Sequence, residues 1–183
     1  KAADYFLQYV SKITEALCDK VNYWVTINEP MVYTYQSYIL GVWPPKEKSF
    51  LKAKRVTENL ILAHIKAYKV IHAIYKQRNL SSPSVSIAKN LQAFVPCVPT
   101  LKNKFAIYLR DRYFNFKFIE RLIRHKSLDF VGINYYNRGL IDVQGYSFRN
   151  LLLDTCQKNH SRLKKNSLGW DIYPEGLYEL LLR

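Results

Sequence analysis

The pattern of apolar and polar residues along the chain predicts helices and strands in alternation. Apolar residues recur every three or four positions in the predicted helices, whereas the predicted strands are short runs of β-branched and aromatic residues. The predicted helices span residues 2–19, 50–78 and 103–125, and the predicted strands span 21–29, 85–88 and 128–136. Residues 137–166 give weak signals and are predicted to form an extended loop. This order is typical of consecutive β/α units of a parallel sheet.

The strand predicted over residues 21–29 ends in an unusual polar group. Its sequence with the next residue, V-N-Y-W-V-T-I-N-E-P, is almost entirely apolar before Asn28, Glu29 and Pro30, so we expect both faces of the strand to be buried. Pro30 cannot donate to a sheet ladder and stops the strand. An amide and a carboxylate are therefore predicted at the carboxyl end of a buried strand, where ligands bind in α/β proteins. The alternative is that Asn-Glu-Pro only begins a turn.

Two later stretches are also distinctive. Leu128 to Tyr136 reads L-D-F-V-G-I-N-Y-Y, another apolar strand with the polar Asn134 near its end. Leu168 to Leu177 reads L-G-W-D-I-Y-P-E-G-L.

These stretches, together with T-I-N-E-P, resemble motifs of glycoside hydrolase family 1, the retaining β-glycosidases, and occur in the family's order. The resemblance extends from about residue 5 to residue 182. It implies an α/β fold that is a partial TIM (β/α)8 barrel, roughly strands four to six with their helices. Residues 1–183 are then the central fragment of a single catalytic barrel, since a complete barrel needs about 250 residues.

The resemblance also implies roles for individual residues. Glu29 matches the catalytic acid/base, and Asn28 matches the residue that hydrogen-bonds the sugar 2-hydroxyl. Tyr136 matches the tyrosine that supports the nucleophile, and Asn134 lies in the same sugar site. Trp170 is a candidate aromatic wall for the sugar or the aglycone, and the alternative is a packed anchor for the following helix.

The catalytic nucleophile is not found in the sequence. Thr57-Glu58-Asn59 resembles the family's T-E-N-G nucleophile motif, but it lacks the glycine and lies within a predicted helix, so Glu58 is rejected. His64, on the same helix, is expected to be a structural histidine. Because removal of a nucleophile costs several orders of magnitude in rate, we expect the chain alone to be inactive.

The chain is strongly basic, with 28 Lys and Arg against 14 Asp and Glu. The basic residues recur at helical intervals, and we interpret them as solvated outer faces of helices, with no nucleic-acid partner. A basic nucleic-acid-binding module is the alternative. No run of about 18 apolar residues occurs, so no membrane span is predicted.

The three cysteines, Cys18, Cys97 and Cys156, form no C-x-x-C pair and match no zinc spacing. Their odd number predicts reduced thiols in a reducing compartment, and hence a cytoplasmic location. Neither a metal nor a cofactor is expected.

The sequence therefore predicts part of a retaining β-glycosidase that acts on small-molecule β-glycosides, with the remaining barrel strands supplied by other parts of the protein. The alternative is a catalytically inactive carbohydrate-binding or interaction remnant of the same fold. The two differ in whether the gene continues to a strand that ends in T-E-N-G.

Overall fold

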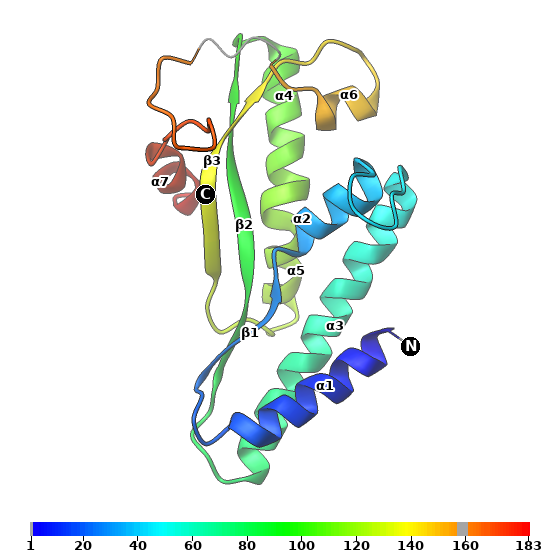
Figure 1. Ribbon diagram of the computed structural model, residues 1–183, viewed down its shortest axis with the longest axis vertical. Coiled ribbons are helices and arrows are strands. Elements are labelled where there is room, and N and C mark those ends of the chain that lie inside the picture. Colours follow the sequence, from blue (N-terminus) through cyan, green and yellow to red (C-terminus); the bar gives the residue numbers. More distant parts are fainter. Residues whose placement is uncertain (1, 157–160) are drawn as a thin grey trace. The chain divides into compact units, whose positions relative to one another are not determined.

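The computed structural model describes residues 2–156 and 161–183 (Figure 1). Helices and strands alternate along most of the chain. In order, the elements are α1 (Ala2–Leu17), β1 (Tyr23–Asn28), α2 (Pro30–Thr34), the π-helical turn η1 (Tyr35–Ile39), α3 (Phe50–Gln77), β2 (Ser84–Pro96), α4 (Leu101–Arg110), the π-helical turn η2 (Asp111–Phe116), α5 (Lys117–Arg124), β3 (Gly132–Ile141), α6 (Phe148–Leu153) and α7 (Glu175–Leu181).

The described chain divides into two compact units. Unit 1 contains residues 2–90 and 118–133, and unit 2 contains residues 91–117, 134–156 and 161–183. β2 and β3 each have residues in both units.

The strands form one sheet in the order β1-β2-β3. β1 runs parallel to β2, with Tyr23 opposite Ser84 and Asn28 opposite Ala88. An irregularity in the register falls between Val25 and Asn28, just before the strand ends. The predicted alternation of helix and strand, with parallel pairing of the first two strands, is confirmed.

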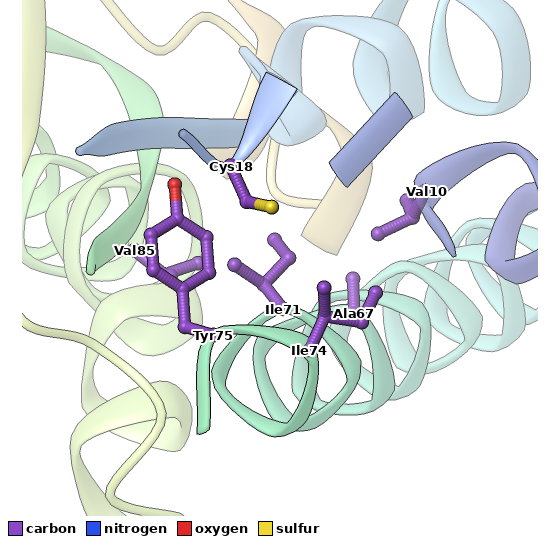
Figure 2. Close-up of a cluster of buried hydrophobic side chains, with 7 residues drawn as sticks. All are labelled: Val10, Cys18, Ala67, Ile71, Ile74, Tyr75 and Val85. Atoms are coloured by element: carbon purple, nitrogen blue, oxygen red, sulfur yellow. The ribbon is translucent and has the colours of Figure 1, made fainter. Parts of the chain in front are cut away.

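Unit 1 is held together by α1 and α3, which pack against each other and against the first residues of β2 (Figure 2). The buried cluster consists of Val10, Cys18, Ala67, Ile71, Ile74, Tyr75 and Val85. Ala67, Ile71 and Ile74 recur at helical spacing on α3, so one stripe of this helix is apolar. Full burial of a residue such as Ile71 contributes about 1.5–3 kcal/mol. This packing fixes the sheet on α3.

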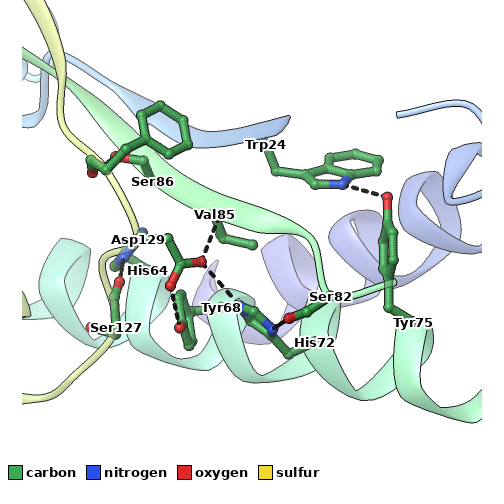
Figure 3. Close-up of polar contacts among 11 residues, drawn as sticks. Trp24, His64, Tyr68, His72, Tyr75, Ser82, Val85, Ser86, Ser127 and Asp129 are labelled. Carbon is green, nitrogen blue, oxygen red and sulfur yellow. Dashed lines mark hydrogen bonds and ion pairs between the residues drawn. The ribbon is translucent and has the colours of Figure 1, made fainter. Parts of the chain in front are cut away.

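β1 differs from the prediction that both its faces are buried. Tyr23 is 73% exposed and Val25 is 51% exposed, whereas Trp24 between them packs against the buried cluster. Successive side chains of a strand point to opposite faces, so the face that carries Trp24 packs on α3 whereas the face that carries Tyr23 and Val25 is exposed. The indole N–H of Trp24 donates to the hydroxyl of Tyr75 (2.8 Å), which fastens the buried face to α3 (Figure 3).

Asp129 fastens the start of β2 to α3 and to the loop before β3 (Figure 3). Its carboxylate accepts the Val85 backbone N–H (2.8 Å) and the Tyr68 hydroxyl (2.7 Å), and lies 3.2 Å from His72 Nε2. Burial raises the pKa of Tyr68 to about 12, and the charge of Asp129 adds to that effect. The buried strand thus begins at a fixed point on α3.

Several elements differ from the prediction, since α2 and η1 were not predicted, β1 begins at Tyr23 instead of residue 21, and β3 begins at Gly132 instead of residue 128. β2 continues to Pro96 instead of ending at residue 88, because Leu91 and Ala93 keep alternate positions buried. The predicted helix over 103–125 contains the π-helical turn η2, where the buried Asn115 accepts the N–H of Gln92 and donates to its carbonyl.

Within the predicted loop over 137–166, β3 continues to Ile141 and a short helix, α6, follows. The helix starts at a capping box formed by Ser147 and Asn150. Residues 157–160 of this predicted loop lie outside the described residues.

The prediction of three reduced cysteines is wrong in the structure. Cys97 and Cys156, 59 residues apart, form a disulfide within unit 2, and Cys18 is a buried free thiol. Parity and spacing could not show this pairing, because Cys156 reaches Cys97 only where the chain returns after α6 to lie beside Leu140 of β3. The Cys97 N–H donates to Ile141 O (2.9 Å), and the Cys156 N–H donates to Leu140 O (3.0 Å).

The disulfide predicts one free thiol in each chain. Titration of the unreduced protein in denaturant should therefore count one thiol, and Cys97→Ser should raise the count to two. Peptide mapping should recover Cys97 and Cys156 in one linked fragment. Three free thiols in the wild-type chain would contradict the pairing.

Candidate active site

The end of β1 presents the two polar side chains that the sequence singled out. Asn28 is exposed and Glu29 is partly exposed. The Glu29 N–H donates to Ala88 O (2.7 Å), and its carbonyl accepts the N–H of Val32 (3.0 Å) in α2. Glu29 is therefore both the last ladder residue of the strand and the N-cap of the next helix.

The backbone of Glu29 is left-handed, with φ 49° and ψ 54°. A residue with a Cβ adopts this conformation at a cost of about 1–2 kcal/mol. Pro30 follows as the first residue of α2, where its missing N–H costs nothing. The strain persists because the strand ladder before it and the helix after it fix both sides of the residue, and such strain concentrates at functional sites.

Lys89 lies on β2 beside this strand end and was not predicted from the sequence. Lys89 is 0% exposed, and its ammonium donates a hydrogen bond to Asn90 O. Burial lowers the pKa of Lys89 from 10.5 to about 7, and attraction to Glu29 opposes that shift. The available signal was a single lysine within the apolar run of β2, V-S-I-A-K-N-L.

His64 on α3 supports the strand that carries the site through Thr26, and its contact with Ser127 is seen in Figure 3. It is fully buried, its Nε2 lies 2.5 Å from Ser127 O, and its Nδ1 lies 2.6 Å from Thr26 Oγ1. A carbonyl only accepts, so Nε2 carries the proton and the Thr26 hydroxyl donates to Nδ1. Burial lowers the pKa of His64, which keeps the ring neutral. The prediction that His64 is a structural histidine is confirmed by these contacts.

Glu58 also lies where the sequence predicted, in the middle of α3. Its carboxylate accepts from the guanidinium of Arg121 on α5 (2.8 Å). This carboxylate ties two helices of unit 1 together and is not at a strand end.

Unit 2 brings together two other predicted site residues. Tyr136 on β3 and Trp170 meet edge to face, with ring centroids 6.2 Å apart and planes at 65°. Tyr136 is 53% exposed and Trp170 is 40% exposed. Asn134 lies two residues before Tyr136, on the same side of the strand, and is partly exposed.

Trp170 is positioned by the ion pair that follows it. Arg138 Nε donates to the carboxylate of Asp171 (2.9 Å), and both side chains are largely buried. Burial alone would raise the pKa of Asp171, but hydrogen bonds from Arg138 and Ser161 lower it. Asp171 therefore holds the chain segment that carries Trp170 against β3.

A close backbone approach fixes the start of α7. A side chain at Gly176 would lie 2.4 Å from the hydroxyl of Tyr135, so only glycine fits. The same hydroxyl donates to Tyr173 O (2.6 Å).

The predicted site residues thus form two groups. Asn28 and Glu29 lie in unit 1, and Asn134, Tyr136 and Trp170 lie in unit 2. Their catalytic and binding roles stay predictions.

Other kinds of site find little support in the described residues. A cavity of about 590 Å³ in unit 2 is lined by Cys97, Cys156, Arg138 and Asp142 among others, and none of the predicted site residues lines it. In residues 2–156 and 161–183, no group of three or more His, Cys, Asp and Glu side chains could hold a metal ion. Over the same residues, no helix combines the length and apolar character needed to cross a bilayer.

Comparison with known proteins agrees with the family resemblance seen in the sequence. The family model for glycosyl hydrolase family 1 matches residues 1–125. The chain is 29% identical to the galactolipid galactosyltransferase SFR2, chloroplastic, of Arabidopsis thaliana, over 100% of this chain and 28% of that protein. It is 28% identical to beta-glucosidase A of Acetivibrio thermocellus, over 98% of this chain and 45% of that protein.

Solved structures agree with the predicted fold. The chain aligns with a beta-glycosidase from Pyrococcus horikoshii at a TM-score of 0.83 and 28% identity, covering 98% of this chain and 43% of that one. These structures are TIM barrels, so the predicted partial (β/α)8 barrel is confirmed. The chain spans less than half the length of the relatives named here.

The buried His64 predicts how stability depends on acid pH. Its folded pKa lies below the ordinary value of 6.5, so below about pH 6.5 the unfolded chain binds a proton that the folded chain does not. The free energy of unfolding should therefore fall as the pH drops from 7 to 5, and His64→Gln should remove this component. Urea unfolding at several pH values measures it.

His125→Gln, at an exposed histidine, is the matched control and should leave the acid dependence as in the wild-type chain. Equal acid dependence in the wild-type and His64→Gln proteins would contradict a neutral, buried His64.

Proposed function

Because the chain belongs to glycosyl hydrolase family 1, we propose that it is part of a retaining β-glycosidase that hydrolyses β-linked glucosides or galactosides. The single observation that carries the proposal is the placement of Glu29. Its carboxyl group follows a parallel strand directly, in the motif T-I-N-E-P, on a backbone held in a strained conformation. The names of the relatives, beta-glucosidase A among them, support the substrate class.

In the proposed reaction Glu29 acts as the acid and then as the base. It protonates the leaving glycosidic oxygen while a second carboxylate attacks the anomeric carbon, and it later removes a proton from the water that releases the sugar. Asn28, exposed beside it, is proposed to hydrogen-bond the sugar 2-hydroxyl, a contact that strengthens in the transition state.

The residues of unit 2 are proposed to complete the sugar site. Tyr136 is assigned to support the nucleophile, and Asn134 to contact the sugar. Trp170 offers an exposed ring edge and face on which an apolar sugar face can stack.

The second carboxylate of the pair is not assigned to this chain. Retaining hydrolysis needs it about 5–5.5 Å from the first. The sequence contains Thr-Glu-Asn once, at 57–59, where Glu58 of α3 pairs with Arg121 of α5. We therefore propose that these 183 residues do not complete the reaction alone.

A second candidate is glycosyl transfer. The relative SFR2 aligns with the whole chain and is named a galactolipid galactosyltransferase. In transfer, Glu29 would remove the proton of an acceptor hydroxyl instead of that of water, so the same acid/base serves both reactions. Analysis of products in the presence of alcohol acceptors separates them, because hydrolysis yields free sugar and transfer yields a new glycoside.

The cytoplasmic location expected from the sequence loses its main argument. It depended on three reduced thiols, whereas Cys97 and Cys156 are paired in the structure. Stable disulfides are more frequent in oxidising compartments.

The acid/base role of Glu29 predicts a dependence on the leaving group. In the protein as produced from its own gene, Glu29→Gln should lower kcat/KM about 10²- to 10⁴-fold for alkyl β-glucosides, whose leaving oxygen needs a proton. For 2,4-dinitrophenyl β-glucoside, which leaves without one, the loss in kcat/KM should be less than about 10-fold.

Glu15→Gln makes the same chemical change at an exposed site on α1 and should leave both values unchanged. A uniform loss across leaving groups would exclude Glu29 as the acid. Turnover by the purified 183-residue chain that Glu29→Gln abolishes would show instead that the chain holds its own second carboxylate.

A further inference from the structure

Lys89 is a buried charged group that the proposed mechanism does not use. It is among the largest fully buried side chains of the described chain, and the residues before it on β2, Val85 to Ala88, are apolar or small. Taking an ammonium ion out of water costs several kcal/mol unless charge or hydrogen bonds compensate. A lysine at this position therefore needs a partner.

The parallel ladder places that partner. Asn28 is opposite Ala88, and the Glu29 N–H donates to Ala88 O, so Glu29 lies beside the residue that directly precedes Lys89. The Glu29 carboxylate attracts the ammonium, and the carbonyl of Asn90 accepts a hydrogen bond from it. Both compensating groups belong to unit 1.

We propose that Lys89 is a positioning residue for Glu29: its buried ammonium holds the Glu29 carboxylate at the end of β1. The geometry supports this role because both residues are fixed by the same ladder and Lys89 has no exposure through which water could replace the carboxylate. The inference concerns the site of the proposed function and rests on that function for its catalytic meaning.

The pair should respond to pH near neutrality. The pKa of Lys89 is about 7, so its ammonium loses its proton as the pH rises through that value, and Glu29 then loses its cationic partner.

Other titratable groups on the neighbouring elements of unit 1 have partners of their own. On α3, His64 contacts Thr26 and Ser127, and Glu58 pairs with Arg121 of α5. On α2, the ring of Tyr33 packs edge to face against Tyr38 of η1. The residues of β3 in unit 1, Gly132 and Ile133, do not titrate.

The test is an NMR titration of the 183-residue chain, following the Lys89 ε-methylene carbon and the Glu29 carboxyl carbon. In the wild-type chain the Lys89 signal should titrate with a midpoint near 7, and the Glu29 carboxyl signal should show an inflection at the same pH. Glu29→Gln should lower the Lys89 midpoint by about one pH unit or more, because it removes the neighbouring negative charge.

Glu15→Gln is the matched control and should leave the Lys89 midpoint unchanged. The proposal is overturned if Glu29→Gln leaves the midpoint where it was, or if the Glu29 signal shows no inflection while Lys89 titrates. The second measurement uses the wild-type chain alone, so it decides the matter even where the variant does not fold. Neither NMR measurement depends on turnover, so the result of the titration is independent of the leaving-group test of the proposed function.

Discussion

The parallel ladder between β1 and β2 is the constraint on which the candidate site depends. It ends at the hydrogen bond from Glu29 to Ala88, and at that point the chain turns through a left-handed residue into α2. The ladder is fixed in turn by α3, whose apolar stripe packs on Val85 and whose polar groups hold the strands at Thr26 and Val85. The contact between α3 and Val85 is indirect, because Asp129 accepts both the Val85 N–H and the hydroxyl of Tyr68 on α3. The strand end therefore cannot shift without breaking buried contacts.

Much of this arrangement could be predicted from the sequence because it follows from local pattern. Helical periodicity located α1 and α3 within two residues, and the abrupt change from apolar residues to Asn28-Glu29-Pro30 marked the strand end. The features that were missed depend on contacts between distant segments. Exposure of Val25 depends on which face of β1 packs on α3, and the almost entirely apolar sequence of the strand does not show this. The disulfide depends on where two strands end.

Lys89 shows the same limit at the level of one residue. A lysine inside an apolar strand can point to solvent or into the protein, and the pattern of β2 does not distinguish the two. The hydrogen bond to Asn90 O and the pairing with β1, which places Glu29 beside the residue before Lys89, explain how the ammonium is buried. Tyr136 and Trp170 became candidate site residues for a different reason, because they were identified by resemblance to a family and not from periodicity.

Membership of the family, a partial β/α barrel and a carboxyl group at the end of β1 together lead to a β-glycosidase as the proposed function. The most direct test of the central claim is to identify the carboxyl group nearest a bound sugar's glycosidic oxygen. N-bromoacetyl-β-D-glucosylamine carries its electrophile at that position, and peptide mass spectrometry locates the alkylated residue in the protein produced from its own gene. The account predicts alkylation of Glu29, suppressed by excess glucose. Glucose-protected alkylation at another carboxyl group, with Glu29 unmodified, would contradict it.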